Sequence, residues 1–533
     1  MKTSLKRGLL CLLALVLLAL PCLLAGCGGG KDPIPSGTSA NGNGNENGDG
    51  NGSGETQGGG ENGGSDTNPS EDSDETRYKP TEKNYDRDFT MLTKVEEFYY
   101  SGYVYTKDNE PREICDVAIW QRQNFLEEAF DITLKRLPAT GTTAVDQFNQ
   151  SVQGGGKICD VACLTGTDSM SAAVSGFLID VNRIKGLNLA APYWDQRIQE
   201  EYRIQDYLFT LEGDFNYIDD LRTFVTIYND TMFEDLGFYD TYGSPYELSK
   251  DGKWTYAKMM EMIKACGHID SGKGKPELDT WGMVSECSAP YYYFLGSGMK
   301  MLKNEGGTLS LAFESNWDLT YSTIEDYLNM DKDSAVVVAN RPNSFSDASD
   351  IWTTASDIFQ YNRALFRSTS LSAVLRLLDM KDDYGIMPIP AYTEGQDGYF
   401  CWVDPGNHFP MTFPVTSWQE IDEIGEMAEV LGYYSLYGAD SLNVAFYDLL
   451  AYARLCRRPE DKKMLRLVFA NKTYDIDLAL KISGTFSAIY AISYNKSYDT
   501  LSTSFTTVRD SAEETMRKRV SELVANLAKQ NLN

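Results

Sequence analysis

The chain has 533 residues, a formal net charge of −29 at pH 7, and an aromatic content of 12%. This acidic balance argues strongly against nucleic acid as a partner and against electrostatic docking on anionic lipid, because both surfaces are negatively charged. His268 and His408 are the only histidines, and neither stands in an H-E-x-x-H motif. We therefore expect no metal and no organic cofactor.

Residues 1–26 are predicted to be a secretory signal. Lys2, Lys6 and Arg7 precede an almost wholly apolar run that extends to Leu24, which is the n-region and h-region order of such signals. The next residues, Leu-Ala-Gly-Cys27, resemble the bacterial lipobox. The resemblance implies that the signal is removed before Cys27 and that Cys27 is lipidated, with palmitate or similar chains. Two or three acyl chains, at about 0.8 kcal/mol per buried methylene, make a firm anchor.

Residues 27–80 are predicted to be a lipidated, disordered tether. Between Gly28 and Gly64 there are 15 glycines in 37 residues, and Asn, Ser and Glu fill most of the other positions. A segment of this composition buries too little apolar surface to fold. Flexible-chain scaling gives it an end-to-end distance of roughly 40 Å. The body is therefore expected on the extracytoplasmic face of the cell membrane, held by the lipid alone.

The body, residues 81–533, is too long for one ordinary core and is expected to form two lobes. Cys159 and Cys163 flank Asp-Val-Ala within a probable strand and have no histidine nearby, so we interpret them as small buried hydrophobes rather than zinc ligands. The body holds an odd number of cysteines, which argues against a complete set of disulfides. These cysteines are Cys115, Cys159, Cys163, Cys266, Cys287, Cys401 and Cys456.

Strand and helix patterns alternate at the start of the body. The order predicts an α/β fold with a parallel sheet covered by helices. Ligands bind at the carboxyl ends of the strands in such sheets. Asp168 and Ser169, just past the third strand, are therefore candidate contacts. The predicted elements are a strand at 88–93, a helix at 116–130, a strand at 132–136, a helix at 145–152 and a strand at 158–164.

Several ordered motifs in the body resemble those of one family. They are ICDVACLTG, SGFLIDVNRIKGLNLAAPYWD, FVTIYNDTMFEDLGF, DGKWTYAKMMEMIKAC with Thr255 as helix cap, and DDYGIMPIPAYTEGQDGYF. In this order they are similar to the extracellular solute-binding proteins of bacterial ABC importers, family 1, maltose-binding-like, of the clostridial type. The resemblance implies a two-lobe periplasmic-binding-protein-like fold of type II, with the ligand cleft between lobes joined by hinge strands.

The resemblance also implies an organisation and a function. Lobe 1 comprises about residues 81–226 and 400–445, lobe 2 comprises about 227–399 and 446–533, and the chain crosses at 227–229. The lobes close on a small-molecule solute, and the closed form delivers it to ABC permease subunits. No bond is broken in this process, so we expect a binding protein rather than an enzyme. We also expect the protein to be a monomer.

The aromatic content predicts an oligosaccharide as the solute, because sugars need stacking rings and hydrogen-bonding groups. Replacement of a ligand-stacking residue such as Trp402 is expected to weaken binding without lowering stability. Three alternatives remain open: a surface receptor of the same fold without a transporter, a peptide-binding lipoprotein, and a glycan hydrolase that uses two carboxylates. The predicted ligand contacts are Trp120 and Arg122 in the cleft floor, Asp168, Ser169, Tyr228, Asn229, Tyr291, Tyr292, Tyr293, Trp402 and Asp404.

Replacing Cys27 with Ser removes the only sulfur at the predicted lipidation site. We expect Cys27→Ser to leave the protein either released from membranes or as the uncut precursor, because acylation precedes cleavage at a lipobox. Metabolic labelling with palmitate and membrane fractionation check this outcome. Normal lipid labelling of the variant would contradict the prediction, and the fold of the body is expected to be unchanged.

Overall fold

The computed structural model describes residue 80 and residues 83–94, 103–106, 110–139, 142–346, 350–438 and 440–530. The predicted signal, Cys27 and nearly all of the predicted tether lie outside these residues. Residues 67–533 form one compact unit, to which all the elements below belong. Among the described helices, none combines the length and the apolar character that a membrane span requires.

The first sheet has four strands in the order β13-β3-β1-β2. β1 (Arg87–Lys94) pairs in parallel with β2 (Ile132–Ala139) and with β3 (Val161–Cys163), and α2 (Ile114–Phe130) and α3 (Thr142–Gln153) connect the strands. This arrangement confirms the predicted alternation, although β3 is shorter than the strand expected at 158–164. The fourth strand, β13 (Met411–Thr412), arrives from far along the chain and pairs antiparallel with β3.

The second sheet has six strands, in the order β11-β4-β10-β6-β5 with β9 paired to β6. β6, β9 and β10 run parallel to one another, and β4 runs antiparallel to β10 and β11. Every residue of β4, β10 and β11 is buried, which explains why their sequences do not alternate between apolar and polar residues. The strands are β4 (Phe224–Asn229), β5 (His268–Ile269), β6 (Thr280–Ser285), β9 (Val336–Val338), β10 (Ala364–Ser370) and β11 (Tyr384–Met387).

Helices and short strands complete the unit. Among them, α10 begins where predicted, because the Thr255 hydroxyl accepts a hydrogen bond from the backbone N–H of Lys258. The helices are α4 (Gly166–Val174), α5 (Gln196–Glu201), α6 (Ile218–Leu221), α7 (Asp230–Asp235), α8 (Phe238–Tyr242), α9 (Pro245–Lys250), α10 (Tyr256–Cys266), α11 (Ala289–Gly296), α12 (Trp317–Met330), α13 (Ile351–Gln360), α14 (Leu371–Val374), α15 (Ile421–Leu436), α16 (Pro459–Ala470), α17 (Ile476–Leu480), α18 (Thr485–Asn495) and α19 (Leu501–Leu527), with a π-helical segment at Val444–Leu455. The short strands are β7 (Leu302–Glu305), β8 (Thr308–Leu311), β12 (Cys401–Trp402) and β14 (Lys472–Thr473).

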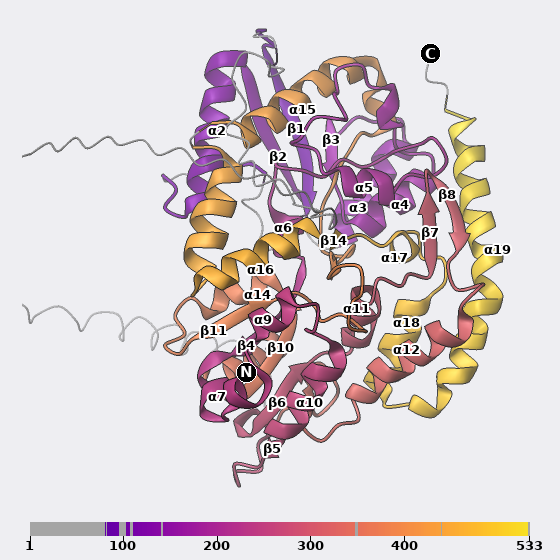
Figure 1. Cartoon of the computed structure of the whole chain (residues 1–533). Coiled ribbons are helices and arrows are strands. Elements are labelled where there is room, and N and C mark those ends of the chain that lie inside the picture. The colour runs from indigo at the N-terminus through magenta and orange to yellow at the C-terminus, as the bar shows by residue number, and fades with distance from the viewer. Residues whose placement is uncertain are drawn as a thin grey trace, which may run out of the picture. The chain divides into compact units, whose positions relative to one another are not determined.

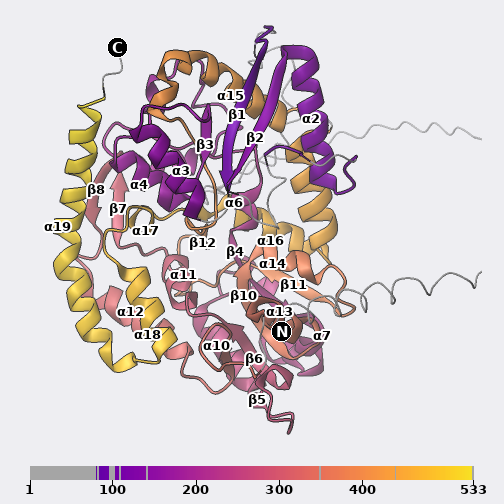
Figure 2. The ribbon, with the colours of Figure 1, turned by 180° about the vertical axis from the view of Figure 1, so that it is seen from behind.

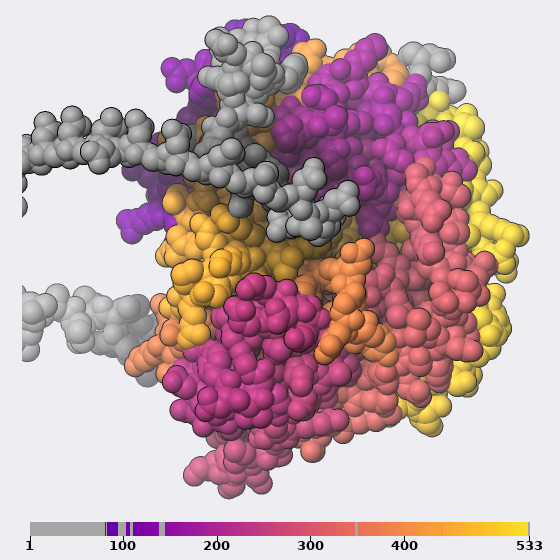
Figure 3. Space-filling view, in the orientation of Figure 1, coloured from indigo at the N-terminus to yellow at the C-terminus, as the bar shows by residue number. Residues whose placement is uncertain are grey.

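The long helix α19 runs beside both groups of elements, from α18 and α12 toward α4 (Figures 1 and 2). Near its start the ring of Phe505 lies 6.2 Å from the ring of Trp317 in α12. Near its end the side-chain amide of Asn526 donates to the Val174 carbonyl of α4, at 2.8 Å. Figure 3 shows α19 in yellow against the salmon surface of the β7–β8 hairpin. The helix therefore makes contacts with elements near both sheets.

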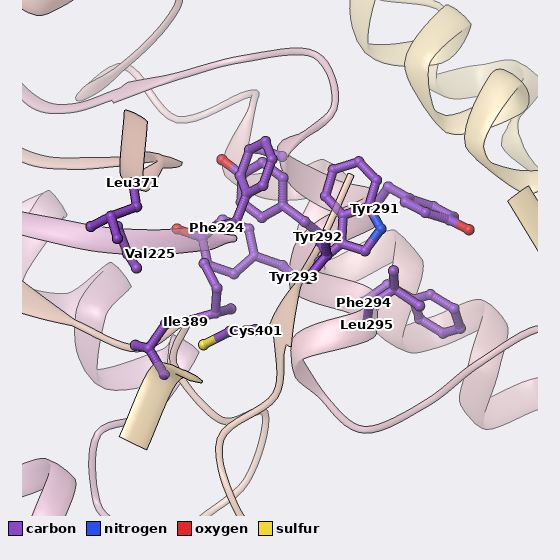
Figure 4. Close-up of a cluster of buried hydrophobic side chains, with 14 of the residues drawn as sticks. Phe224, Val225, Tyr291, Tyr292, Tyr293, Phe294, Leu295, Leu371, Ile389 and Cys401 are labelled. Atoms are coloured by element: carbon purple, nitrogen blue, oxygen red, sulfur yellow. The ribbon is translucent and has the colours of Figure 1, made fainter. Parts of the chain in front are cut away.

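Two hydrophobic clusters form the core. The smaller one, which includes Phe89, Trp194, Phe413 and Met427, lies at the first sheet, where α15 packs. The larger one extends from residues of the first sheet such as Leu92 and Ala162 to the second sheet. It includes the aromatic residues of β4 and α11 shown in Figure 4. Residues 411–436 lie at the first sheet, and the predicted division into lobes stays a prediction.

A buried lysine joins segments from distant parts of the chain. Lys472 lies in β14, and its ammonium is 3.1 Å from an oxygen of Asp195 and 3.0 Å from one of Asp220, with Asp219 also in contact. Burial by itself lowers the pKa of Lys472, but the aspartates outweigh burial and raise it well above its usual value. The lysine is therefore charged, and it fixes β14 against α6.

Removing this lysine leaves buried carboxylates without their cation. We expect Lys472→Met to lower the free energy of unfolding by about 3 to 5 kcal/mol at pH 7. Burial raises the pKa of Asp195, but Lys472 outweighs burial and holds it below its usual value. This stabilisation is present above the unfolded pKa of about 3.9 and is lost as the pH falls below it, so the deficit of the variant should shrink in acid.

Urea denaturation at neutral and acidic pH measures the deficit. Lys185→Met is the control, because Lys185 pairs with Asp422 at the surface with 85% of its side chain exposed. An exposed pair contributes about 0 to 1 kcal/mol. Equal losses for the two variants would contradict the assignment of Lys472 as the buried anchor.

Candidate ligand-binding cavity

A cavity of about 700 Å³ lies at one end of the second sheet. Glu286 and Ser288 follow β6, Asn340 follows β9, and Ser370 ends β10. These three strands are parallel, so their carboxyl ends meet at one edge, which is where ligands bind in open α/β sheets. The lining residues are Arg222, Phe224, Glu286, Ser288, Asn340, Trp352, Ser356, Arg367, Thr369, Ser370, Ser372, Ala373, Leu375, Arg376, Trp402, Asp404, Asn407, Phe486 and Tyr490.

The opposite wall comes from segments that connect the two sheets. Arg222 and Phe224 lie where the chain enters β4, and Asp404 and Asn407 belong to the loop between β12 and β13. The Asp404 carboxylate accepts hydrogen bonds from the Gly406 backbone, at 2.8 Å, and from the Asn407 side chain, at 2.6 Å. Because β13 belongs to the first sheet, the cavity lies at the passage between the two sheets.

The aromatic lining residues differ in accessibility. Trp352, on α13, has 44% of its surface exposed, whereas Trp402 has 1%. Phe486 and Tyr490 lie one turn apart on α18, with ring centroids 6.0 Å apart. Trp402 packs against Phe224 with ring centroids 4.9 Å apart, so it forms part of the wall. Trp352 is therefore the ring best placed to be covered by a ligand.

The charged lining residues are unevenly paired. Arg367 lies within β10 with 4% of its surface exposed, and it donates to the Ser356 hydroxyl at 2.7 Å. Burial lowers the pKa of Arg367 to about 10, so it stays protonated at neutral pH. Burial raises the pKa of Glu286 to about 7, although the Ser288 hydroxyl donates to it at 2.8 Å. The cavity thus presents a permanent cation and a carboxyl that is only partly ionised.

Of the contacts predicted from the sequence, Trp402 and Asp404 line this cavity. Tyr228 and Asn229 lie in β4 but have structural roles. The Asn229 side chain caps α7 by accepting from the Met232 N–H at 2.9 Å, and the Tyr228 hydroxyl lies 3.5 Å from that of Tyr239. Both residues have no exposed surface. They support the strand rather than line the cavity.

The tyrosines of α11 are core residues that do not line this cavity, and their predicted contact with ligand stays a prediction. Tyr291, Tyr292 and Tyr293 are at most 1% exposed. Tyr292 donates to the Ser368 carbonyl at 3.3 Å, and Tyr293 lies 2.5 Å from the Ser368 hydroxyl. Figure 4 shows the three rings gathered with Phe224. They hold α11 against β10, so their contribution to the cavity is indirect.

Asp168 and Ser169 lie on α4 and do not line the cavity. The Asp168 backbone N–H donates to the Thr165 hydroxyl at 3.1 Å, which caps the helix. The Thr167 N–H donates to the Pro405 carbonyl at 3.1 Å. The loop that contains Asp404 therefore packs on the start of α4, where the first sheet was expected to bind ligand.

Trp120 and Arg122 do not form a cleft floor. Both lie on α2, where Trp120 has 36% of its surface exposed and Arg122 is buried. The Arg122 guanidinium donates to the Phe215 carbonyl at 2.9 Å, to the Ser435 hydroxyl at 2.7 Å and to the Tyr103 carbonyl at 2.7 Å. Arg122 thus ties α2 to neighbouring segments, a structural role that its sequence context did not reveal.

Sequence reasoning missed Trp352, Arg367 and Glu286. Trp352 lies in a stretch without a recognised motif. Arg367 lies in β10, and Glu286 follows β6. An arginine inside the otherwise apolar and hydroxyl-rich strand ALFRSTS was an available signal, since a buried charge needs a partner. Within the described part of the chain, no group of His, Cys, Asp and Glu is arranged to hold a metal ion.

No protein-family model and no curated protein matches the chain. Solved structures do match its fold. A cyclo/maltodextrin-binding protein in complex with maltotetraose aligns with a TM-score of 0.51 and 12% identity, over 82% of this chain and 98% of that one. An ABC substrate-binding protein of Listeria monocytogenes in complex with cycloalternan gives 0.51 and 12%, over 81% and 98%. The chain therefore has the two-lobe α/β fold of these binding proteins, as predicted.

The two cavity tryptophans should respond differently to truncation. We expect Trp402→Ala to lower the free energy of unfolding by about 3 to 5 kcal/mol, because it empties a packed site. Trp352→Ala is expected to change it by less than about 1 kcal/mol, because the ring is partly in solvent. Urea denaturation without ligand measures both. The prediction for Trp402 replaces the expectation from the sequence that this residue can be removed without loss of stability. Equal effects of the two substitutions on the free energy of unfolding would contradict the prediction.

Proposed function

We propose that this protein is the solute-binding component of an ABC importer and that it captures an oligosaccharide in the cavity at the end of the second sheet. The proposal rests mainly on the composition of the cavity, which combines aromatic rings with hydroxyl, amide and charged groups at the passage between the two sheets. The shared fold with two proteins solved in complex with maltotetraose and cycloalternan supports the proposal.

The cavity has the properties that a sugar requires. Its volume of about 700 Å³ lies within the range of about 300 to 1,000 Å³ that is usual for small-molecule sites. Trp352 and Tyr490 contribute aromatic rings for the apolar side of a sugar ring. Asn340 and Asn407 each donate one amide N–H within the protein, to Tyr490 and Asp404, and each has a second N–H for a sugar hydroxyl. Binding here would draw on both walls, and closure about β4 would bring them together.

The proposal includes the cellular arrangement predicted from the amino terminus. Lipidated Cys27 would hold the protein on the extracytoplasmic face of the membrane, and the glycine-rich segment would let the body reach solute and permease. Capture followed by delivery needs no covalent step, so the protein would act without turnover.

A second function, glycoside hydrolysis, is favoured by one observation. Two carboxyl groups, Glu286 and Asp404, line the same cavity, and burial raises the pKa of Glu286 to about 7, which suits a general acid. The Asp404 oxygens are bound within their own loop, which argues against a nucleophilic role. Release of reducing ends from oligosaccharides, abolished in Glu286→Gln, would establish hydrolysis in place of transport.

Ligand binding should stabilise the protein without generating product. In a thermal-unfolding screen with malto-, xylo- and galacto-oligosaccharides and with tri- and tetrapeptides, we expect at least one oligosaccharide to raise the melting temperature. A ligand at about 100 times its Kd adds about 2.7 kcal/mol. Trp352→Ala should weaken binding of that oligosaccharide by about ten- to hundredfold, as for a lost stacking ring.

Exposed Trp120 provides the matched control, because it lies on α2 and does not line the cavity. Trp120→Ala should leave the affinity unchanged in isothermal titration. Stabilisation by peptides alone would contradict the carbohydrate proposal. An equal loss of affinity in both tryptophan variants would contradict the assignment of the cavity as the site.

A further inference from the structure

We infer that the oligosaccharide taken by this cavity is acidic and that its carboxylate, that of a uronic acid residue, pairs with Arg367. This inference rests on the proposed function and names the substrate class of the same site. Its basis is the arrangement of charge around the cavity rather than the fold.

Arg367 is a buried cation with an incomplete set of partners. It lies in the interior of the second sheet, between β4 and β6 in register with Ile227 and Val284, and is 4% exposed. Among the described residues, Ser356 provides its one hydrogen-bond acceptor, and no Asp or Glu oxygen lies within 4.0 Å of the guanidinium. A guanidinium has several more N–H donors than one hydroxyl can satisfy.

A buried charge without a partner in the protein is costly. Folded proteins retain such a charge chiefly where a group outside the protein, such as a ligand, pairs with it. The carboxyl of Glu286 is the group that most strongly offsets the effect of burial on the pKa of Arg367. Glu286 forms no ion pair with the arginine and is only partly ionised at neutral pH. The cavity therefore contains a cation that the described protein groups do not neutralise.

The remaining charges add to this bias. Arg222 and Arg376 also line the cavity, and Arg376 donates to the Thr353 hydroxyl at 2.6 Å with Asp350 at 3.9 Å. Asp404, the other acidic lining residue, is committed to the hydrogen bonds of its own loop. A chain with a net charge of −29 thus places three arginines around one cavity. Such a site attracts anions and disfavours cations.

The neighbouring groups define the kind of anion. The planar guanidinium matches the two oxygens of a carboxylate. A monoanion matches the single charge of Arg367, the buried arginine for which the described chain shows no acidic partner within 4.0 Å. Trp352, Tyr490, Ser370 and Ser372 line the same cavity as the arginine and supply rings and hydroxyl groups of the kind that bind sugars. A sugar ring that carries a carboxylate uses both features at once.

The test compares matched acidic and neutral ligands. Isothermal titration of the full chain uses oligogalacturonate against its methyl ester, and glucuronate-substituted xylo-oligosaccharide against the unsubstituted form. We expect the acid form of at least one pair to bind at least about tenfold more tightly, which corresponds to about 1.4 kcal/mol. This comparison needs no variant, so it does not depend on whether Arg367 tolerates replacement.

Variants then assign the effect to the residue. Arg367→Gln should reduce affinity for the acid form on the order of 100-fold and reduce affinity for the neutral form far less, while Arg367→Lys should keep part of the preference. Arg517→Gln changes the net charge equally on an exposed part of α19, where 76% of the side chain is accessible, and should leave the preference intact.

The outcomes separate this inference from the proposed function. Equal or tighter binding of the neutral forms would overturn the acidic ligand and leave an oligosaccharide-binding protein. A preference for the acid form that persists in a folded Arg367→Gln variant would overturn the role of Arg367. Tighter binding of sugar phosphates than of uronates would overturn the inference that the ligand's anionic group is a carboxylate. Binding of acidic peptides but of no oligosaccharide would overturn both proposals.

Discussion

The buried contact of Lys472 with Asp195, Asp219 and Asp220 is the interaction on which the cavity depends. Asp219 and Asp220 lie in α6, immediately before the segment that enters β4, and β14 pairs with β12. The lysine therefore fixes the start of β4 relative to the residues that follow β12. These two segments supply one wall of the cavity, so its geometry is set by an ion cluster that no ligand touches.

The opposite wall follows from strand direction. Because β6, β9 and β10 are parallel, their carboxyl ends deliver Glu286, Asn340 and Ser370 to one edge without any special loop design. The packing of the α11 tyrosines behind β10 keeps this edge rigid. One wall of the cavity is packed against the α11 tyrosines, and the other wall lies where the chain enters β4. This arrangement suits the proposed closure of the site on its ligand.

Within that frame, Arg367 and Glu286 give the site its chemical character. A neutral sugar needs aromatic rings and hydrogen-bonding groups, and the cavity supplies both. Binding a neutral sugar does not require a desolvated guanidinium. In the inferred role, the arginine would add selection by charge to selection by shape. The Asp404 carboxylate accepts hydrogen bonds from its own loop, and no ion pair joins it to Arg367 among the described residues.

The sequence by itself determined the α/β class, the first parallel strands, and local features such as the Thr255 cap, because these depend on neighbours within a turn or a strand. Two residues that it proposed as ligand contacts, Trp402 and Asp404, line the candidate cavity. Only the tertiary structure decided which strand ends stay open. The loop of residues 405–408 packs on the start of α4, and Asp168 does not line the cavity at the second sheet. Burial of Tyr291–Tyr293 and the meeting of Trp352 with Arg367 likewise depend on long-range pairing, which no local pattern records.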